Sequence, residues 1–193
     1  MTLLLQEGVQ GRPVYRWTVE KYVRAIEAGE FPPDYQAELI DGIIVEKMSI
    51  GTPHAYATRT LRSRFERTLG DAYVVGSQEP VVLPNTSRPE PDLWLAAPPP
   101  QRYARRDPGP DDLSLVVEVA DSSFDFDEKT KLPMYSVAMV VEYWIVDIPR
   151  RRLLRYTEPD GVEAYAKTEE YAADQTLDHP TFGRVPVAEL FAD

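Results

Sequence analysis

The stretch 113-LSLVVEVADSSFDFDEKTKLPMY-135 decides the fold of this chain. Its first eight residues form the most apolar strand-like segment, which is the pattern of a strand at the centre of a sheet covered on both faces. Glu118 nevertheless stands in this run and shares one face of the predicted strand with Val116 and Ala120, both apolar. An ionised carboxylate buried there costs free energy unless something pairs with it or binds it. Either the strand is half exposed, or Glu118 has a partner that offsets this cost.

The residues after this strand predict a helix and then a second central strand. Residues 127–139 have helical character, but Pro133 is tolerable only in a first turn because proline lacks the N–H that a helix interior uses. Residues 141–147 are again strongly apolar. A helix that connects two central strands favours a parallel crossover within one sheet.

Apolar periodicity and turn residues predict the other elements. Helices are expected over 18–28 and from Thr52, as N-cap with Pro53 in the first turn, to a stop at Gly70. Two short strands are expected around the tight turn Asp41-Gly42, two more within residues 72–84, and one over 91–96. A further antiparallel pair is expected around a turn at 159–161. Residues 97–112 should form an exposed loop, and a short helix is expected near the end of the chain.

This order predicts the α/β class, with a mixed central sheet flanked by helices. We expect a single domain over residues 1–193. It would consist of an N-terminal arm (1–16), a core (17–156) and acidic C-terminal strands with a short helix (157–193).

Composition narrows the class of protein. The 193 residues are 43% apolar and 27% charged, which suits one globular domain. No stretch is apolar enough to span a membrane, and the N-terminus does not have the pattern of a signal peptide. The sequence has no cysteine, which excludes disulfides and thiolate metal sites and predicts a cytoplasmic location. His54 and His179 are the only histidines, so a multi-histidine zinc site is not expected.

The net charge of −11 is unfavourable to a nucleic-acid partner, since phosphate binding needs basic surface. The charge is uneven, however. Residues 157–193 hold nine acidic and two basic residues, a net −7, which leaves −4 for residues 1–156. Arginines cluster in two places, and solvated surface is the favoured interpretation of both: Arg59, Arg62, Arg64 and Arg67, and then Arg150, Arg151, Arg152 and Arg155.

Three short apolar strands each present one carboxylate: Glu38, Asp92 and Glu118. Converging carboxylates without thiols or imidazoles suit Mg²⁺ or Mn²⁺. Lys129 and Lys131, on the helix after Glu118, could complete a hydrolytic site. Each of these residues also has an interpretation without a functional role. Asp92 and Glu118 could lie at strand ends and face solvent, and Glu38 could be a solvent-exposed hairpin residue. Lys131 could form a surface ion pair with Asp127, four residues earlier on the helix.

An ordered set of motifs resembles the Uma family. The set comprises ELIDG (38–42), TPH (52–54), PD (91–92), VVEVADSS (116–123), Asp127-x3-Lys131-x3-Tyr135 and EYWIVD (142–147). These are restriction-endonuclease-like proteins, common in bacteria and assigned to the PD-(D/E)XK nuclease superfamily. The resemblance covers roughly residues 17–156 and implies a restriction-endonuclease-like core.

The resemblance also implies roles for individual residues. Asp92 and Glu118 would bind Mg²⁺ (or Mn²⁺), with the Val119 carbonyl as a further ligand. The superfamily's lysine position holds Ala120, so Lys131 would reach the site from the following helix and orient or help deprotonate the attacking water. Glu38 would complete the coordination of the metal or of its water. His54 matches the family's histidine, and two interpretations stay open for it: a part in catalysis, or a solvent-facing residue at the start of the helix. The family's usual Gly and Pro before EYW are Met139 and Val141 here.

Three functions follow as hypotheses. The first is a metal-dependent endonuclease that hydrolyses phosphodiester bonds in nucleic acid, with DNA as the favoured substrate. The second is a non-catalytic metal-binding or assembly module that keeps the nuclease fold. The third is hydrolysis of another phosphoester, because function resides in the site and not in the fold. By analogy with nucleases of this kind, we expect a homodimer.

Overall fold

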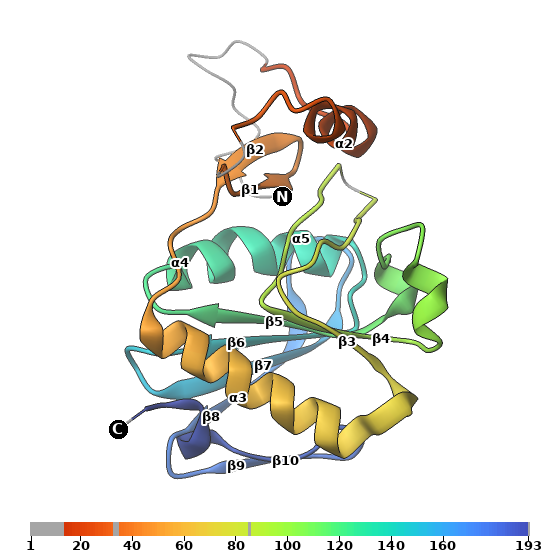
Figure 1. Cartoon of the computed structure of the whole chain (residues 1–193). Coiled ribbons are helices and arrows are strands. Elements are labelled where there is room, and N and C mark those ends of the chain that lie inside the picture. The colour runs from red at the N-terminus through yellow and green to blue at the C-terminus, as the bar shows by residue number, and fades with distance from the viewer. Residues whose placement is uncertain (1–13, 33–34, 85, 193) are drawn as a thin grey trace.

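A six-stranded mixed sheet forms the centre of the structure, a computed structural model that describes residues 14–32, 35–84 and 86–192 (Figure 1). Only β5 and β6 run parallel, and the other neighbours are antiparallel. In spatial order the strands are β3 (Val74–Gly76), β4 (Leu93–Ala96), β5 (Leu113–Ala120), β6 (Glu142–Asp147), β7 (Arg152–Pro159) and β8 (Tyr165–Ala172). The predicted α/β class and mixed sheet are confirmed.

A helical crossover joins the parallel pair β5 and β6, as expected for parallel neighbours. It consists of α4 (Phe124–Phe126), a π-helical turn η4 (Asp127–Lys131) and α5 (Leu132–Val137). Pro133 is the second residue of α5 and therefore lies in the first turn of that segment, as the sequence requires, although helical structure begins nine residues earlier. The wider π turn directly before Pro133 accommodates a residue that has no N–H and would crowd the preceding turn.

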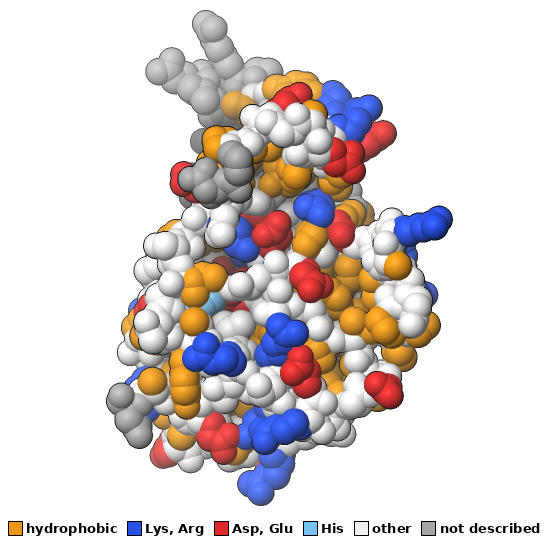
Figure 2. Space-filling model, in the orientation of Figure 1, with side chains coloured by type: hydrophobic (Ala, Val, Ile, Leu, Met, Phe, Trp, Pro, Cys, Tyr) orange, Lys and Arg blue, Asp and Glu red, His pale blue; other side chains and the backbone are white. Residues whose placement is uncertain are grey.

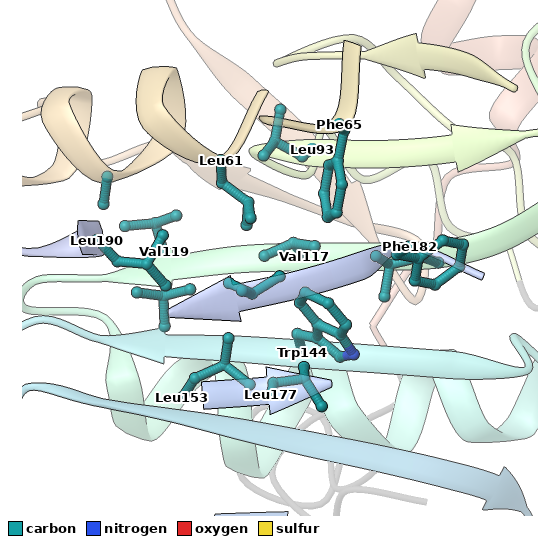
Figure 3. Close-up of a cluster of buried hydrophobic side chains, with 14 of the residues drawn as sticks. Leu61, Phe65, Leu93, Val117, Val119, Trp144, Leu153, Leu177, Phe182 and Leu190 are labelled. Atoms are coloured by element: carbon teal, nitrogen blue, oxygen red, sulfur yellow. The ribbon is translucent and has the colours of Figure 1, made fainter. Parts of the chain in front are cut away.

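Helices cover both faces of the sheet (Figure 1). On one face lies α3 (Thr52–Leu69), whose Leu61 and Phe65 are fully buried against Val117 and Trp144 (Figure 3). The predicted apolar line of this helix is confirmed at Leu61, Phe65 and Leu69, whereas Tyr56 is only half-buried.

The opposite face of the sheet packs against α5, where Tyr135, Tyr143 and Ile145 are fully buried. Val116 and Ala120 of β5 belong to this second cluster, while Val117 and Val119 belong to the first. The alternation expected from the sequence is therefore present, and Glu118 points toward the α5 face between two apolar neighbours.

Two hairpins and a helix lie outside the central sheet. The hairpin of β1 (Ala37–Ile40) and β2 (Ile43–Glu46) sits above α4 and α5 together with α2 (Val19–Glu27) (Figure 1). Asp41 and Gly42 make its tight turn with positive φ angles of 48° and 75°, as their sequence predicts. The second hairpin, β9 (Thr176–His179) with β10 (Gly183–Pro186), was not predicted, and the short helix η5 (Val187–Leu190) that follows it was.

Several predicted boundaries need correction. The N-cap of α3 is Gly51, and Thr52 is already helical. Residues 80–84 form no second strand of the central sheet: Val81 and Leu83 donate their backbone N–H groups to the nearby segment 87–89, and Val82 donates to Pro108. The loop 97–112 contains two short 3₁₀ turns, η2 (Pro100–Tyr103) and η3 (Pro110–Asp112). Most of the predicted N-terminal arm, residues 1–13, lies outside the described residues.

Among the described residues, no helix combines the length and the apolar character that crossing a bilayer requires.

Gly76 gives a test of the packing between β3 and β4. A Cβ at this position would lie 1.9 Å from Trp94, a buried side chain that has little room to move. We expect Gly76→Ala to lower the free energy of unfolding by about 1–3 kcal/mol in urea denaturation. Gly109→Ala is the control, because its Cβ would meet its nearest neighbour at 3.8 Å, an ordinary contact. Equal stability of the two variants would contradict the packing described here.

Candidate active site

A buried lysine connects three separate elements of the structure. Lys131, at the end of the π turn, places Nζ 3.0 Å from Oε1 of Glu38 on β1 and 3.0 Å from Oε1 of Glu118 on β5. Asp127, one turn earlier in the same helix, lies 4.0 Å from Nζ. These four charged residues are at most 5% exposed. The partner that the sequence required for Glu118 is therefore Lys131.

Hydroxyl and amide groups hold the carboxylates of this cluster in place. The Tyr135 hydroxyl donates to Glu118 Oε1 at 3.0 Å, so this oxygen accepts from both Lys131 and Tyr135. Ser123 donates to Asp127 Oδ2 at 2.6 Å, and the backbone N–H of Glu90 donates to Glu38 Oε2 at 3.1 Å. Such bonds satisfy buried acceptors that would otherwise destabilise the fold.

Asp92 lies beside this cluster at the start of β4. Leu93, the first residue of β4, pairs with Val117 of β5. Asp92, which directly precedes β4, therefore lies opposite Glu118 in the continuation of this antiparallel register. Its Oδ2 accepts a hydrogen bond from the backbone N–H of Val119 at 2.8 Å and lies 3.1 Å from Nε2 of His54. The structure thus brings Asp92 and His54 together across 38 residues of sequence.

These side chains line a pocket of about 270 Å³. Its wall comes from β2, the start of α3, the ends of β4 and β5, and the helical crossover. Seven carboxylates and only two lysines line it, so its interior is strongly acidic. An acidic pocket of this kind favours a cationic occupant.

Burial and neighbouring charges shift the pKa values in the pocket. Burial raises the pKa of Glu118 well above its ordinary value, and the nearby Lys131 opposes that shift. Burial also raises the pKa of Asp127 to about 6, again against the effect of Lys131. For Lys131, burial alone would lower the pKa, but the charges of Glu118, Glu38 and Asp127 raise it overall. Lys131 is accordingly an ammonium ion at neutral pH, a hydrogen-bond donor and not a base.

The structure corrects the solvent-exposed interpretations of four residues. Glu38 is not a hairpin residue in water, since it is only 4% exposed and bonded to Lys131. Lys131 does not form a surface pair with Asp127. Neither Asp92 nor Glu118 meets solvent at a strand end, as both are buried.

Sequence reasoning gave no site role to Asp127 or Tyr135, although both belong to the cluster. The signal was present in the spacing Asp127-x3-Lys131-x3-Tyr135, because residues four apart share a helix face. Tyr135 then reaches the same oxygen as Lys131 from the next turn.

The two arginine clusters are largely neutralised by acids. Arg62 and Arg64 of α3 pair with Glu66 and Glu189. In the second cluster, Arg150 and Arg152 bind Asp147, and Arg155 binds Glu142 and Glu169. Figure 2 shows that Lys and Arg side chains on the visible face lie among Asp and Glu side chains. This distribution agrees with solvated surface, the favoured prediction.

The comparison with family models gives a match to Uma2, described as "Putative restriction endonuclease", over residues 19–187. The chain belongs to the Uma2 family. The match extends beyond residue 156, so it includes most of the C-terminal strands of this Uma2 protein, which the sequence motifs did not cover. A search of curated proteins gave no match.

A solved structure shares the Uma2 fold described here. It is a crystal structure from Anabaena variabilis described as "a putative nuclease belonging to DUF820". The TM-score is 0.70 at 14% identity, and the alignment covers 93% of this chain and 98% of the other. The likeness establishes a nuclease-like fold, which confirms the fold predicted from the sequence.

Lys131→Met tests the energetics of the buried cluster. Removing the ammonium group leaves the buried carboxylates of Glu38 and Glu118 without their shared cation, so we expect a loss of about 3–5 kcal/mol in unfolding free energy. Urea denaturation at pH 7 without divalent ions would measure it.

Lys129→Met is the matched control for this test. Lys129 pairs with Asp125 at the surface, where the two side chains are 64% and 76% exposed. Its replacement should leave the unfolding free energy nearly unchanged, because a solvated pair of this kind contributes little to stability. A loss of similar size in the two variants would mean that the buried ion pairs do not stabilise the fold.

Proposed function

We propose that this Uma2 protein is a metal-dependent endonuclease of the PD-(D/E)XK type that hydrolyses phosphodiester bonds in nucleic acid, DNA in particular. The observation that carries the proposal is the meeting of Asp92, Glu118 and Lys131 at one acidic pocket. The order of the motifs and the family membership support it. A cytoplasmic location stays a prediction from the cysteine-free composition.

The donor atoms in the pocket suit Mg²⁺ or Mn²⁺. Asp92 Oδ1 has only a long 3.5 Å contact from Gln78, and among the described residues Oε2 of Glu118 has no hydrogen-bond partner. Two carboxylates with free oxygens are what Mg²⁺ needs, because it keeps several waters of its own. No group of three His, Asp or Glu side chains within the described part of the chain is arranged to hold a metal, so the proposed site has two carboxylate ligands, Asp92 and Glu118.

A bound Mg²⁺ or Mn²⁺ supplies Lewis acidity, which activates water and stabilises charge on a phosphoryl group. The chain's own residues then have distinct tasks. Lys131, held as an ammonium ion, donates hydrogen bonds to an attacking water or to a phosphoryl oxygen. Glu38 orients Lys131, and His54 fixes the rotamer of Asp92 through the 3.1 Å contact.

One observation favours a second candidate, a non-catalytic module that keeps the fold. Lys131 already lies within 3.0 Å of both Glu38 and Glu118, so the cluster satisfies its charges internally. Under this alternative, the carboxylates and the lysine stabilise the fold, and any cation that binds has a structural role.

Nuclease assays on plasmid, linear and single-stranded DNA and on RNA, with Mg²⁺ or Mn²⁺, test the proposal. We expect Asp92→Asn and Glu118→Gln each to lower the cleavage rate by about 100-fold or more, since charge stabilisation at the phosphoryl group is lost. Asp125→Asn, which alters an exposed carboxylate outside the pocket, is the control. Equal cleavage by the wild type and by both site variants would refute the proposal.

Calorimetric titration with Mg²⁺ and Mn²⁺ separates the two candidates. The nuclease proposal predicts binding that both site variants lose, together with turnover of a nucleic acid. Binding without turnover of any nucleic acid favours the module. Turnover of a small phosphodiester alone would point to a different phosphoester as substrate.

A further inference from the structure

The strand β8 forms a long and exposed edge of the central sheet. Among the described residues it pairs only with β7, and residues 166–170 and 172 are all exposed. The opposite edge, β3, is only three residues long. An exposed strand of eight residues presents unpaired backbone groups that can pair with another strand.

Backbone groups near the end of β8 face away from β7. The Ala172 N–H donates to the Gln175 side chain, and the Ala172 carbonyl accepts from the Gln175 N–H, so both are directed outward. Backbone direction alternates along a strand, and the pairing with β7 is continuous from residue 167 to 172. Thr168 and Glu170 therefore also direct their N–H and carbonyl groups outward.

The side chains of β8 are complementary to a second, antiparallel copy of the same strand. With a two-fold axis at Thr168, each Lys167 lies opposite Glu169 of the other copy, which gives two opposite-charge pairs. The two Thr168 residues meet at the centre of this pairing. Opposite charges and Thr–Thr pairs are among the cross-strand combinations that stabilise antiparallel sheets.

Neighbouring registers lose this complementarity. A two-fold axis at residue 167 sets Lys167 opposite Lys167, and one at 169 sets Glu169 opposite Glu169. An axis at 170 sets two copies of Glu170 opposite each other. Like charges directly opposite each other destabilise strand pairing, so the charge pattern selects the axis at Thr168.

The surroundings of β8 continue this charge pattern. Within one protomer, Arg155 of β7 lies 2.6 Å from Glu169, and Glu158 lies 2.5 Å from Lys167. A second copy would place Lys167 next to this Arg155–Glu169 pair, so that positive and negative charges alternate across the joined strands. An open groove of about 990 Å³ runs beside the same residues of β7 and β8 and leaves room for side chains of the partner.

We propose that β8 pairs antiparallel with β8 of a second copy of this chain, around Thr168, and joins two sheets into one continuous sheet of twelve strands. The proposal does not depend on nuclease activity.

Sedimentation velocity of the full chain at micromolar concentrations tests this proposal through charge reversal. Lys167→Glu sets Glu opposite Glu169, and Glu169→Lys sets Lys opposite Lys167, so each variant alone should dimerise about tenfold more weakly or worse. In an equimolar mixture of the two variants, a mixed dimer has opposite charges at both pairs. We expect the mixture to recover dimers, detectable as heterodimers by native mass spectrometry.

Arg62→Glu and Glu66→Lys, which reverse charges of an exposed pair on α3, are the matched controls and should leave dimerisation unchanged. Thermal melts verify that each variant is folded. Should either reversal unfold the chain, Thr168→Pro replaces it, because this change removes the central N–H while an outward-facing edge position tolerates proline.

A dimer that Thr168→Pro disrupts, or that the mixture restores, supports the proposal. A monomeric wild type would overturn it and would mean that the charges of β8 protect the edge. A wild-type dimer that resists both reversals, or that resists Thr168→Pro, would also overturn it.

Discussion

The buried ammonium group of Lys131 is the interaction on which the site depends. It lies between carboxylates from an outlying hairpin, a central strand and its own helix, so the positions of these three elements are coupled. Each of these charges would cost several kcal/mol of desolvation if it were buried alone. Together they satisfy one another only when β1, β5 and the crossover helix pack correctly. The cluster therefore couples the correct fold to the formation of the pocket.

The helical crossover explains why the lysine comes from this direction. Position 120, two residues after Glu118 on the same face, holds an alanine that is fully buried in the cluster on the α5 side of the sheet. A lysine at this fully buried position would have no solvent to reach, whereas Lys131 on the crossover reaches both Glu38 and Glu118. Lys131 is the last residue of the π turn Asp127–Lys131, and Pro133 follows two residues later. Local irregularity of a helix and placement of the charged group thus coincide, as often happens at functional sites.

Net charge is a poor guide to the surface of this Uma2 protein. The arginines, which by sequence could have formed a basic face, mostly pair with carboxylates, whereas the pocket is lined by seven carboxylates and two lysines. An acidic pocket and a mixed surface favour binding of a cation over direct attraction of phosphate groups. For the proposed pairing of β8 with a second copy, the order of the charges along the strand is important, whereas their sum is not.

The sequence by itself determined the elements with strong local patterns: the apolar strands at 113–120 and 142–147, the hairpin turn at Asp41-Gly42, the helix ending at Gly70, and the alternation that isolates Glu118 on one face. Periodicity and turn chemistry act over a few residues and can be recognised in one chain. Only the tertiary structure decided that Glu38 is buried, that His54 meets Asp92, and that residues 80–84 join no strand of the central sheet. These outcomes depend on which distant segments pack together, and burial of a charged group is decided by the partner that the rest of the fold brings to it.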